Sequence, residues 1–275
     1  MLFDMPTQSM QASVQNYMTI DTEDWFQVFY ANDEIPLDSW SDQESRLSKM
    51  LDRSLKLLDQ HNTKATFFCV AWLAEKHPAL IKALADAGHE IGCHTYWHLP
   101  LNQISVEQFK DDITKAKKLL EDVTGQEVIG FRAPGYSLKR QDQSYIDVIE
   151  DVGFKYDSSI VGPPSAPYKI GKTLVEIPAT GLKLGAGYYP ANGGTFFRFL
   201  TFSMYKSYVR SLNRKGHPLN FYTHTWELYT DYPQVIRHPI KRLIQYHNLN
   251  KVHDRMDQLM QEFPFTSIQK ACFQS

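Results

Sequence analysis

Two histidines four residues apart, His94 and His98, form the pair of side chains in this sequence best suited to metal chemistry. They follow a short apolar run, and in a helical turn residues i and i+4 lie on the same face. Two neutral imidazoles on one face can bind a divalent metal, with a carboxylate to complete the set. With ten histidines in the chain, a chance surface pair is the alternative reading.

Carboxylates follow a strand-like run near the N-terminus, at Asp21, Glu23 and Asp24. Buried acids at the end of a strand are costly unless a cation or an arginine compensates them. Side chains at i and i+2 of an extended chain share a face, so Asp21 and Glu23 can point into one pocket. One of them could act on water while the other binds the metal. Asp24 would point away unless the chain turns there.

Three further polar positions follow strand-like runs, at Arg132, at Asp157-Ser158-Ser159 and at His224. A guanidinium can orient a basic carboxylate, and a histidine near neutral pKa is a natural general acid. Each also has an ordinary interpretation: Arg132 as part of a turn before a proline, Asp157 as a helix cap, and His224 as a core histidine.

The elements that must position these residues alternate between strands and helices. Strands are predicted near 17–20, 65–70, just before His94, and near 128–131, 154–156, 174–177 and 219–223, with helices near 41–58, 79–87, 105–123, 141–152, 200–214, 239–246 and 250–262. Ser41 with Glu44 and Ser105 with Gln108 are capping-box signals for the first and third of these helices. Such alternation is typical of a parallel α/β sheet, either a barrel or doubly wound. The candidate residues all come just after a strand, where the active sites of barrels lie.

Composition narrows the class of protein. The chain has 275 residues, a net charge of −2 and 43% hydrophobic residues, which suits one globular α/β unit and predicts no nucleic-acid partner. No apolar run is long enough to span a membrane. Residues 1–16 lack the pattern of a signal peptide and the three cysteines form no CxxC pair, so we expect a reducing, cytoplasmic location. The sequence does not predict an oligomeric state.

In order along the chain, five motifs resemble those of the polysaccharide deacetylases, the NodB-homology proteins of carbohydrate esterase family four. They are Thr19-Ile20-Asp21-Thr22-Glu23-Asp24, His94-Thr95-Tyr96-Trp97-His98, Phe131-Arg132-Ala133-Pro134-Gly135-Tyr136, Asp157-Ser158-Ser159 and Phe221-Tyr222-Thr223-His224. The resemblance implies a distorted (β/α)7 barrel with a core at about 17–227. Residues 228–275 would form a short helical C-terminal appendage of the same single domain.

The resemblance also implies roles for these residues in removing N-acetyl groups from sugar units of a polysaccharide or its precursor. Asp21 would be the base and His224 the acid, Arg132 would orient the base, and the backbone amide of Tyr136 would help to bind the oxyanion. His94 and His98 would hold a divalent metal, zinc by default with cobalt, nickel or iron as alternatives.

The first motif departs from the family pattern, because many members have two adjacent aspartates where this chain has Asp21-Thr22. Glu23 is therefore the first choice for the acidic metal ligand, and Asp24 the second. Predicted substrate contacts are Trp97, Asp157, Gly194 and Trp226. The segment Gly193-Gly194-Thr195-Phe196-Phe197-Arg198 resembles a narrower branch that lacks signal peptides and is associated with exopolysaccharide biosynthesis loci.

Two other functions fit the same residues. One is hydrolysis of a small cyclic or linear amide, as in purine-pathway relatives with an Asp-x-acid motif. The other is carbohydrate binding without catalysis on the same fold. Aromatic and glycine-rich residues at 187–202 favour a sugar substrate, and the retention of five separate chemical groups favours catalysis.

Overall fold

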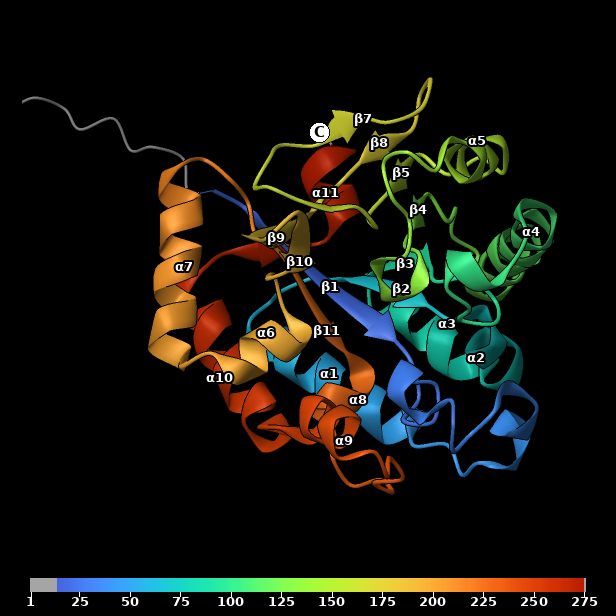
Figure 1. Cartoon of the computed structure of the whole chain (residues 1–275), viewed down its shortest axis with the longest axis horizontal. Helices are drawn as coiled ribbons and strands as arrows, with labels where there is room; N and C mark the ends of the chain where they lie inside the picture. The colour runs from blue at the N-terminus through green and yellow to red at the C-terminus, as the bar shows by residue number, and fades with distance from the viewer. Residues whose placement is uncertain (1–13, 275) are drawn as a thin grey trace, which may run out of the picture.

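The computed structural model describes residues 14–274, and a curled, mostly parallel sheet lies at its centre (Figure 1). Seven strands follow one another in parallel pairs in the order β11, β1, β2, β3, β4, β5, β8. Their bounds are β11 Asn220–His224, β1 Asn16–Thr22, β2 Thr66–Cys69, β3 Glu90–Cys93, β4 Gly130–Phe131, β5 Tyr156–Asp157 and β8 Val175–Glu176. β7 (Tyr168–Lys169) adds an antiparallel edge, and β12 (Phe265–Thr266) pairs with β1.

No backbone ladder between β11 and β8 closes the sheet among residues 14–274. The side chain of Asn220 crosses this seam instead, because its amide donates to the carbonyl oxygen of Ile177 at 3.1 Å and to Ser158 Oγ at 2.9 Å. The predicted α/β fold with a distorted barrel and a helical C-terminal region is confirmed. The distortion lies at this seam.

Helices cover the outside of the sheet (Figure 1). In chain order they are α1 Leu47–Gln60, α2 Ala71–Lys76, α3 Pro78–Asp86, α4 Val106–Thr124, α5 Gln143–Asp151, α6 Gly194–Phe199, α7 Phe202–Arg214, α8 Thr225–Leu228, α9 Pro239–Tyr246, α10 Val252–Glu262 and α11 Ile268–Cys272. α4 begins with the expected capping box of Ser105 and Gln108. The capping signal at Ser41 and Glu44 is misleading, because α1 starts only at Leu47.

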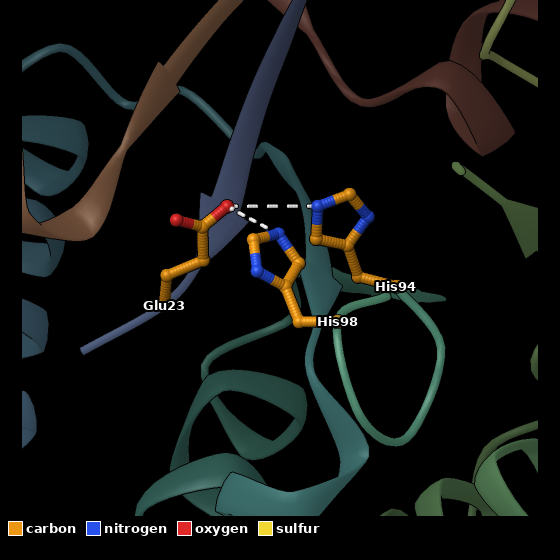
Figure 2. A group of neighbouring side chains, drawn as sticks. All are labelled: Glu23, His94 and His98. Carbon is orange, nitrogen blue, oxygen red and sulfur yellow. Dashed lines mark ion pairs between the residues drawn. The ribbon is translucent and has the colours of Figure 1, made fainter. Parts of the chain in front are cut away.

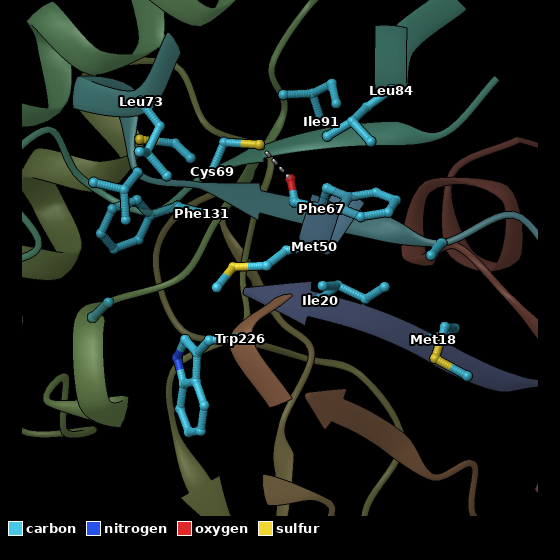
Figure 3. Packing of buried hydrophobic residues seen from close by; sticks show 14 of the residues in the cluster. Met18, Ile20, Met50, Phe67, Cys69, Leu73, Leu84, Ile91, Phe131 and Trp226 are labelled. Carbon is cyan, nitrogen blue, oxygen red and sulfur yellow. Dashed lines mark hydrogen bonds between the residues drawn. The ribbon is translucent and has the colours of Figure 1, made fainter. Parts of the chain in front are cut away.

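The core forms where β1 and β2 meet the helices packed against them. Met18 and Ile20 of β1 and Phe67 of β2 are fully buried, together with Met50 of α1 (Figure 3). These side chains alternate along their strands, as expected when one face of each strand packs against helices. The other face is then free to carry polar groups, and Thr19 and Asp21 lie on it.

Residues 160–198 contain more structure than the sequence predicts. β6 (Val161–Gly162), β9 (Ala179–Leu184) and β10 (Gly187–Pro190) form a separate three-stranded sheet. Gly185 makes the turn of the β9–β10 hairpin with φ of 60°, a backbone conformation that glycine adopts readily. The glycines and prolines of this region thus lie both in turns, such as Gly185, and within the short strands, such as Gly181 and Pro190.

The C-terminal region returns to the main sheet. After α9 and α10, β12 lies parallel to β1, and Phe265 and Ile268 are buried. Within residues 14–274, no helix combines the length and the hydrophobicity needed to cross a bilayer. The expectation about a signal peptide concerns residues 1–16, most of which lie outside the described part of the chain.

Candidate active site

A cavity of about 530 Å³ opens at the carboxyl ends of the parallel strands. Its walls include Asp21 and Glu23 after β1, His94 after β3, Arg132 after β4 and His224 at the end of β11. Parallel strands bring their carboxyl ends to one edge of a sheet. Residues more than 200 positions apart in the sequence thereby meet in one place.

The segment from His94 to His98 is a tight loop rather than the helical turn that the spacing suggested. Thr95 and His98 both have positive φ, at 63° and 55°. The Thr95 hydroxyl accepts a hydrogen bond from the His98 backbone N–H at 2.9 Å, which closes the loop. The two imidazoles converge, with ring centroids 4.9 Å apart. The two imidazoles therefore lie close together, as the i, i+4 spacing indicated, but a tight loop rather than a helical turn brings them there.

Backbone carbonyls fix the orientation of both imidazoles. His94 Nδ1 lies 2.7 Å from the carbonyl oxygen of Arg132, and His98 Nδ1 lies 2.9 Å from that of Gln27. A carbonyl can only accept, so each Nδ1 carries the proton and each Nε2 presents a lone pair. A hydrogen bond from Nδ1–H to a backbone carbonyl is typical of histidines that bind metal through Nε2.

Glu23 faces both imidazoles (Figure 2). Its Oε1 lies 3.0 Å from His98 Nε2 and 3.6 Å from His94 Nε2, and all three side chains are buried. His98 Nε2 has no hydrogen-bond partner of good geometry among the described residues, although Glu23 is close. Burial alone would raise the pKa of Glu23, but when the imidazoles of His98 and His224 are protonated their charge outweighs burial and holds this pKa well below its usual value. One carboxylate oxygen and two imidazole lone pairs thus point at a common space, which is the donor set of a divalent metal site.

Asp24 takes no part in this cluster. Its carboxylate accepts hydrogen bonds from the backbone N–H of Trp25 and Arg46 and from the hydroxyl of Ser45. The chain turns after Glu23 and directs Asp24 toward the start of α1, where it satisfies donors that α1 itself leaves free. The second choice for the acidic ligand therefore has a structural contact set instead.

Asp21 forms a buried ion pair with Arg132, whose Nη1 lies 2.7 Å from Asp21 Oδ1. The same Nη1 donates to Thr19 Oγ1 at 2.9 Å. Ser158 receives the other two bonds of the guanidinium, from Nε to its carbonyl oxygen and from Nη2 to its hydroxyl. Arg132 is thus held on three sides, and it fixes the carboxylate of Asp21 at the cavity wall.

The fourth motif, Asp157-Ser158-Ser159, packs against Arg132. Asp157 is fully buried, accepts hydrogen bonds from the Ser159 hydroxyl and backbone N–H, and is not a wall of the cavity. The Ser159 hydroxyl in turn accepts from the backbone N–H of Ala133. The predicted substrate contact at Asp157 is therefore replaced in this structure by packing beneath Arg132.

His224 lies beside Asp21, its register partner on the neighbouring strand, and its Nε2 is 3.8 Å from Glu23 Oε1. Its Nδ1 lies 2.8 Å from Glu227 Oε1, a partner that the sequence reasoning missed. Burial by itself would lower the pKa of His224, but the carboxylates of Glu23 and Glu227 raise it to about 9. Glu227 follows His224 by three residues in the sequence, and this spacing is the feature from which their contact could have been predicted.

The remaining predicted residues differ in their positions. Trp226 lines the cavity, donates from Nε1 to Glu23 Oε2 at 3.1 Å and stacks on His224 at 4.7 Å. Tyr136 also lines it, although its backbone N–H donates to the Ala133 carbonyl at 3.2 Å. Trp97 packs on Tyr96 and Trp40 away from the cavity, and Gly194 lies behind its wall.

Asp112 of α4 is a second residue that the sequence reasoning missed. Its carboxylate accepts the backbone N–H groups of Tyr96 at 2.7 Å and Trp97 at 3.1 Å, inside the histidine loop. Burial raises its pKa to about 6. Nothing in the spacing of the sequence pointed to this contact, because it joins a helix to a distant loop.

Comparison with protein-family models divides the chain into two segments. Residues 37–156 match the model of the polysaccharide deacetylases, and residues 155–272 match a domain of unknown function, DUF3473. The first segment contains His94, His98 and Arg132, whereas Asp21, Glu23 and His224 lie outside it. Over residues 37–156 the chain is thus similar to the polysaccharide deacetylases, the NodB-homology proteins of carbohydrate esterase family four.

Similar proteins agree with this assignment. The chain is 37% identical over 118 residues to peptidoglycan deacetylase-like protein FGM2 of Gibberella zeae, covering 42% of this chain and 34% of the relative. It is 38% identical over 86 residues to a peptidoglycan-N-acetylglucosamine deacetylase of Bacillus cereus, covering 31% and 30%. The aligned segments thus span about a third of these relatives.

The fold has a close counterpart among solved structures. A candidate polysaccharide deacetylase from Mycobacterium smegmatis superposes with a TM-score of 0.65 at 17% identity, covering 94% of this chain and 90% of the other. At this identity the similarity establishes the shared fold.

Proposed function

We propose that this protein is a metal-dependent hydrolase that removes N-acetyl groups from sugar units of a polysaccharide or of its precursor. One observation carries the proposal: a three-ligand cluster lies in the same cavity as an arginine-bound aspartate and a histidine paired with a carboxylate. An amide hydrolase needs these three things, namely an electrophilic site, a base and an acid.

The donor set fits a divalent cation held by His94, His98 and Glu23. Two neutral imidazoles and one carboxylate suit zinc, and also cobalt, nickel or iron. When bound, such a metal supplies Lewis-acid activation of the acetyl carbonyl and of a water molecule. The buried Nε2 of His98, which lacks a hydrogen-bond partner of good geometry within residues 14–274, supports this assignment.

Asp21 is the proposed base. Its Oδ1 is held by Arg132, and a carboxylate oxygen of Asp21 lies within 4.8 Å of a Glu23 oxygen and a His224 nitrogen. Asp21 can therefore take a proton from a water molecule that enters this space. Arg132 keeps the carboxylate in one orientation, so little reorganisation is needed at the moment of proton transfer.

His224 is the proposed acid. Because Glu227 accepts from Nδ1–H, the second proton of the imidazolium is on Nε2, which faces the cavity. As the C–N bond breaks, this proton passes to the departing nitrogen and leaves a neutral imidazole. The raised pKa of His224 means that it holds this proton at neutral pH.

The cavity suits a sugar ring. Its volume of about 530 Å³ lies within the range of small-ligand sites. Tyr30, Tyr189, Phe196 and Phe199 contribute aromatic surface, and Tyr189 and Phe199 are 57% and 44% exposed at the mouth. Exposed rings at the rim of a polar site can stack on the apolar face of a sugar. This observation favours a carbohydrate over a small cyclic imide.

A cytoplasmic location is part of the proposal. Cys69 and Cys93 are buried, free, and directly opposite each other on β2 and β3. An odd number of cysteines without CxxC spacing, three in this chain, suits a reducing compartment. In such a compartment, nucleotide-linked or lipid-linked sugars would be the available substrates.

The test is acetate release by protein reconstituted with zinc, measured on N-acetylglucosamine oligomers and, in parallel, as ring opening of small cyclic imides. We expect acetate from the oligomers, no ring opening, and one equivalent of metal by elemental analysis. Ring opening without acetate release would support the rival amidohydrolase. Oligomer binding without turnover by metal-loaded protein would support a non-catalytic carbohydrate-binding protein.

A further inference from the structure

A second buried arginine, Arg198, lies behind the proposed acid. It belongs to α6, is 2% exposed, and its Nε lies 3.6 Å from Glu227 Oε2. Glu227 in turn bonds His224 Nδ1 through its other oxygen. We propose that Arg198 is a positioning residue for proton donation, acting on His224 through Glu227. This inference rests on the proposed function, because it assumes that His224 is the acid.

Two glycines allow α6 to approach β11 closely enough for this contact. Gly193 forms a bridge with Tyr222, and a Cβ on Gly193 would lie 1.8 Å from the Tyr222 carbonyl oxygen. A Cβ on Gly194 would lie 2.4 Å from the Tyr222 hydroxyl. Only glycine fits at both positions, so the Gly193-Gly194 pair determines how closely α6, and with it Arg198, approaches β11.

The C-terminal region holds the guanidinium. Arg198 Nη1 donates to three backbone carbonyls at the end of α9, those of Ile244 at 3.0 Å, Gln245 at 2.8 Å and His247 at 3.1 Å. Carbonyls carry no net charge, so these bonds orient the arginine without neutralising it. Its positive charge remains available to the nearest carboxylate, that of Glu227.

The charge of Arg198 has a specific use. Glu227 is 1% exposed, and a buried carboxylate without a cation is strongly unfavourable. His224 is cationic before it donates its proton and neutral afterwards. Arg198 remains charged throughout, so the carboxylate of Glu227 has a cationic partner at both stages while it accepts from Nδ1. The contact therefore stabilises the state that follows proton transfer.

A purely structural arginine in the same region provides a matched comparison. Arg255 of α10 also donates to three carbonyls, those of Phe197, Arg198 and Leu200, and contacts no carboxylate within 4.0 Å in the part of the chain described. Arg198 makes the same kind of carbonyl contacts but also approaches Glu227. If Arg198 served only to join α6 to α9, replacing either arginine should affect catalysis equally.

The experiment is a double-mutant cycle on the zinc-loaded full chain, with acetate release from an N-acetylglucosamine oligomer as the readout. We expect Arg198→Met to lower kcat about 100-fold with little change in KM, within the range for loss of an acid. In a His224→Ala background, Arg198→Met should change kcat less than about twofold, because the two residues act through one another. Arg255→Met should leave kcat within about threefold of wild type.

A second substrate separates proton donation from general damage. Hydrolysis of 4-nitrophenyl acetate releases a phenolate that needs no proton, so Arg198→Met should spare it. Arg198→Gln, which removes the charge but keeps an N–H donor for the backbone carbonyls, serves as the second variant if Arg198→Met does not fold, and should lose amide hydrolysis selectively. Equal losses on both substrates, or full additivity with His224→Ala, would overturn the inference. Wild-type protein that releases no acetate would instead overturn the proposed function and this inference with it.

Discussion

Arg132 and Arg198 both line the same cavity, and both are almost completely buried. Arg132 touches the proposed base directly, with Asp21 at 2.7 Å and further bonds to Thr19 and Ser158. Arg198 reaches the proposed acid only through Glu227, at 3.6 Å. The base side thus depends on one short ion pair, and the acid side depends on a relay of two contacts.

The difference follows from what each group must do. A base accepts a proton once its carboxylate is fixed, and a bidentate or forked arginine fixes it well. An acid must hold a proton and then lose it, so its partner must remain an acceptor in both states. The two sides also lie in different segments, because Arg132 falls within the deacetylase match and Arg198 within the DUF3473 match.

The largest effect on catalysis should come from replacing Asp21, the proposed base. Asp21→Asn keeps the size of the side chain and removes the proton acceptor, so we expect kcat to fall about 10³- to 10⁴-fold. Metal content should stay near wild type, because His94, His98 and Glu23 are unchanged. Kinetics with elemental analysis checks both; near-normal turnover in this variant would show that another group is the base.

The next largest effect concerns stability. Arg132→Met leaves the buried Asp21 carboxylate without its cation, so we expect the free energy of unfolding to fall by about 3–5 kcal/mol. Urea denaturation measures this. Adding Asp21→Asn to that variant should restore part of the loss, because no uncompensated charge then remains. If the double variant is as unstable as the sum of the two, the ion pair is not the reason.

The sequence predicted the base side better than the acid side, for physical reasons. Strand-end positions such as Asp21, Arg132 and His224 follow from hydrophobic periodicity, since parallel strands must end at one edge. The turn that aims Glu23 inward and Asp24 outward depends on φ/ψ values that a pattern does not contain. Contacts such as Arg198 with Glu227 depend on how closely α6 packs on β11, which is set by tertiary packing.

A smaller effect should appear in the pH dependence of the acid side. Glu227 raises the pKa of His224, and only protonated His224 can donate, so activity falls as the pH rises through this pKa. Glu227→Gln removes the negative charge, and the alkaline limb of the kcat profile should move to lower pH by about one unit. A bound cation lowers the wild-type midpoint below about 9. An alkaline limb that stays in place would argue against a direct effect of Glu227 on His224.

The smallest effect should be on substrate binding at the rim of the cavity, away from the contacts of Arg132 and Arg198. Tyr189 lines the cavity and is 57% exposed, whereas its neighbour Tyr188 is 38% exposed and does not line it. Tyr189→Ala should raise KM for an N-acetylglucosamine oligomer about three- to tenfold, the equivalent of roughly 1 kcal/mol of stacking, with kcat unchanged. Tyr188→Ala, on the same strand, should change neither constant. If both variants behave alike, the β9–β10 hairpin contributes stability rather than a sugar contact. Catalysis would then depend on the base side and the acid side alone, without a separate binding surface at β10.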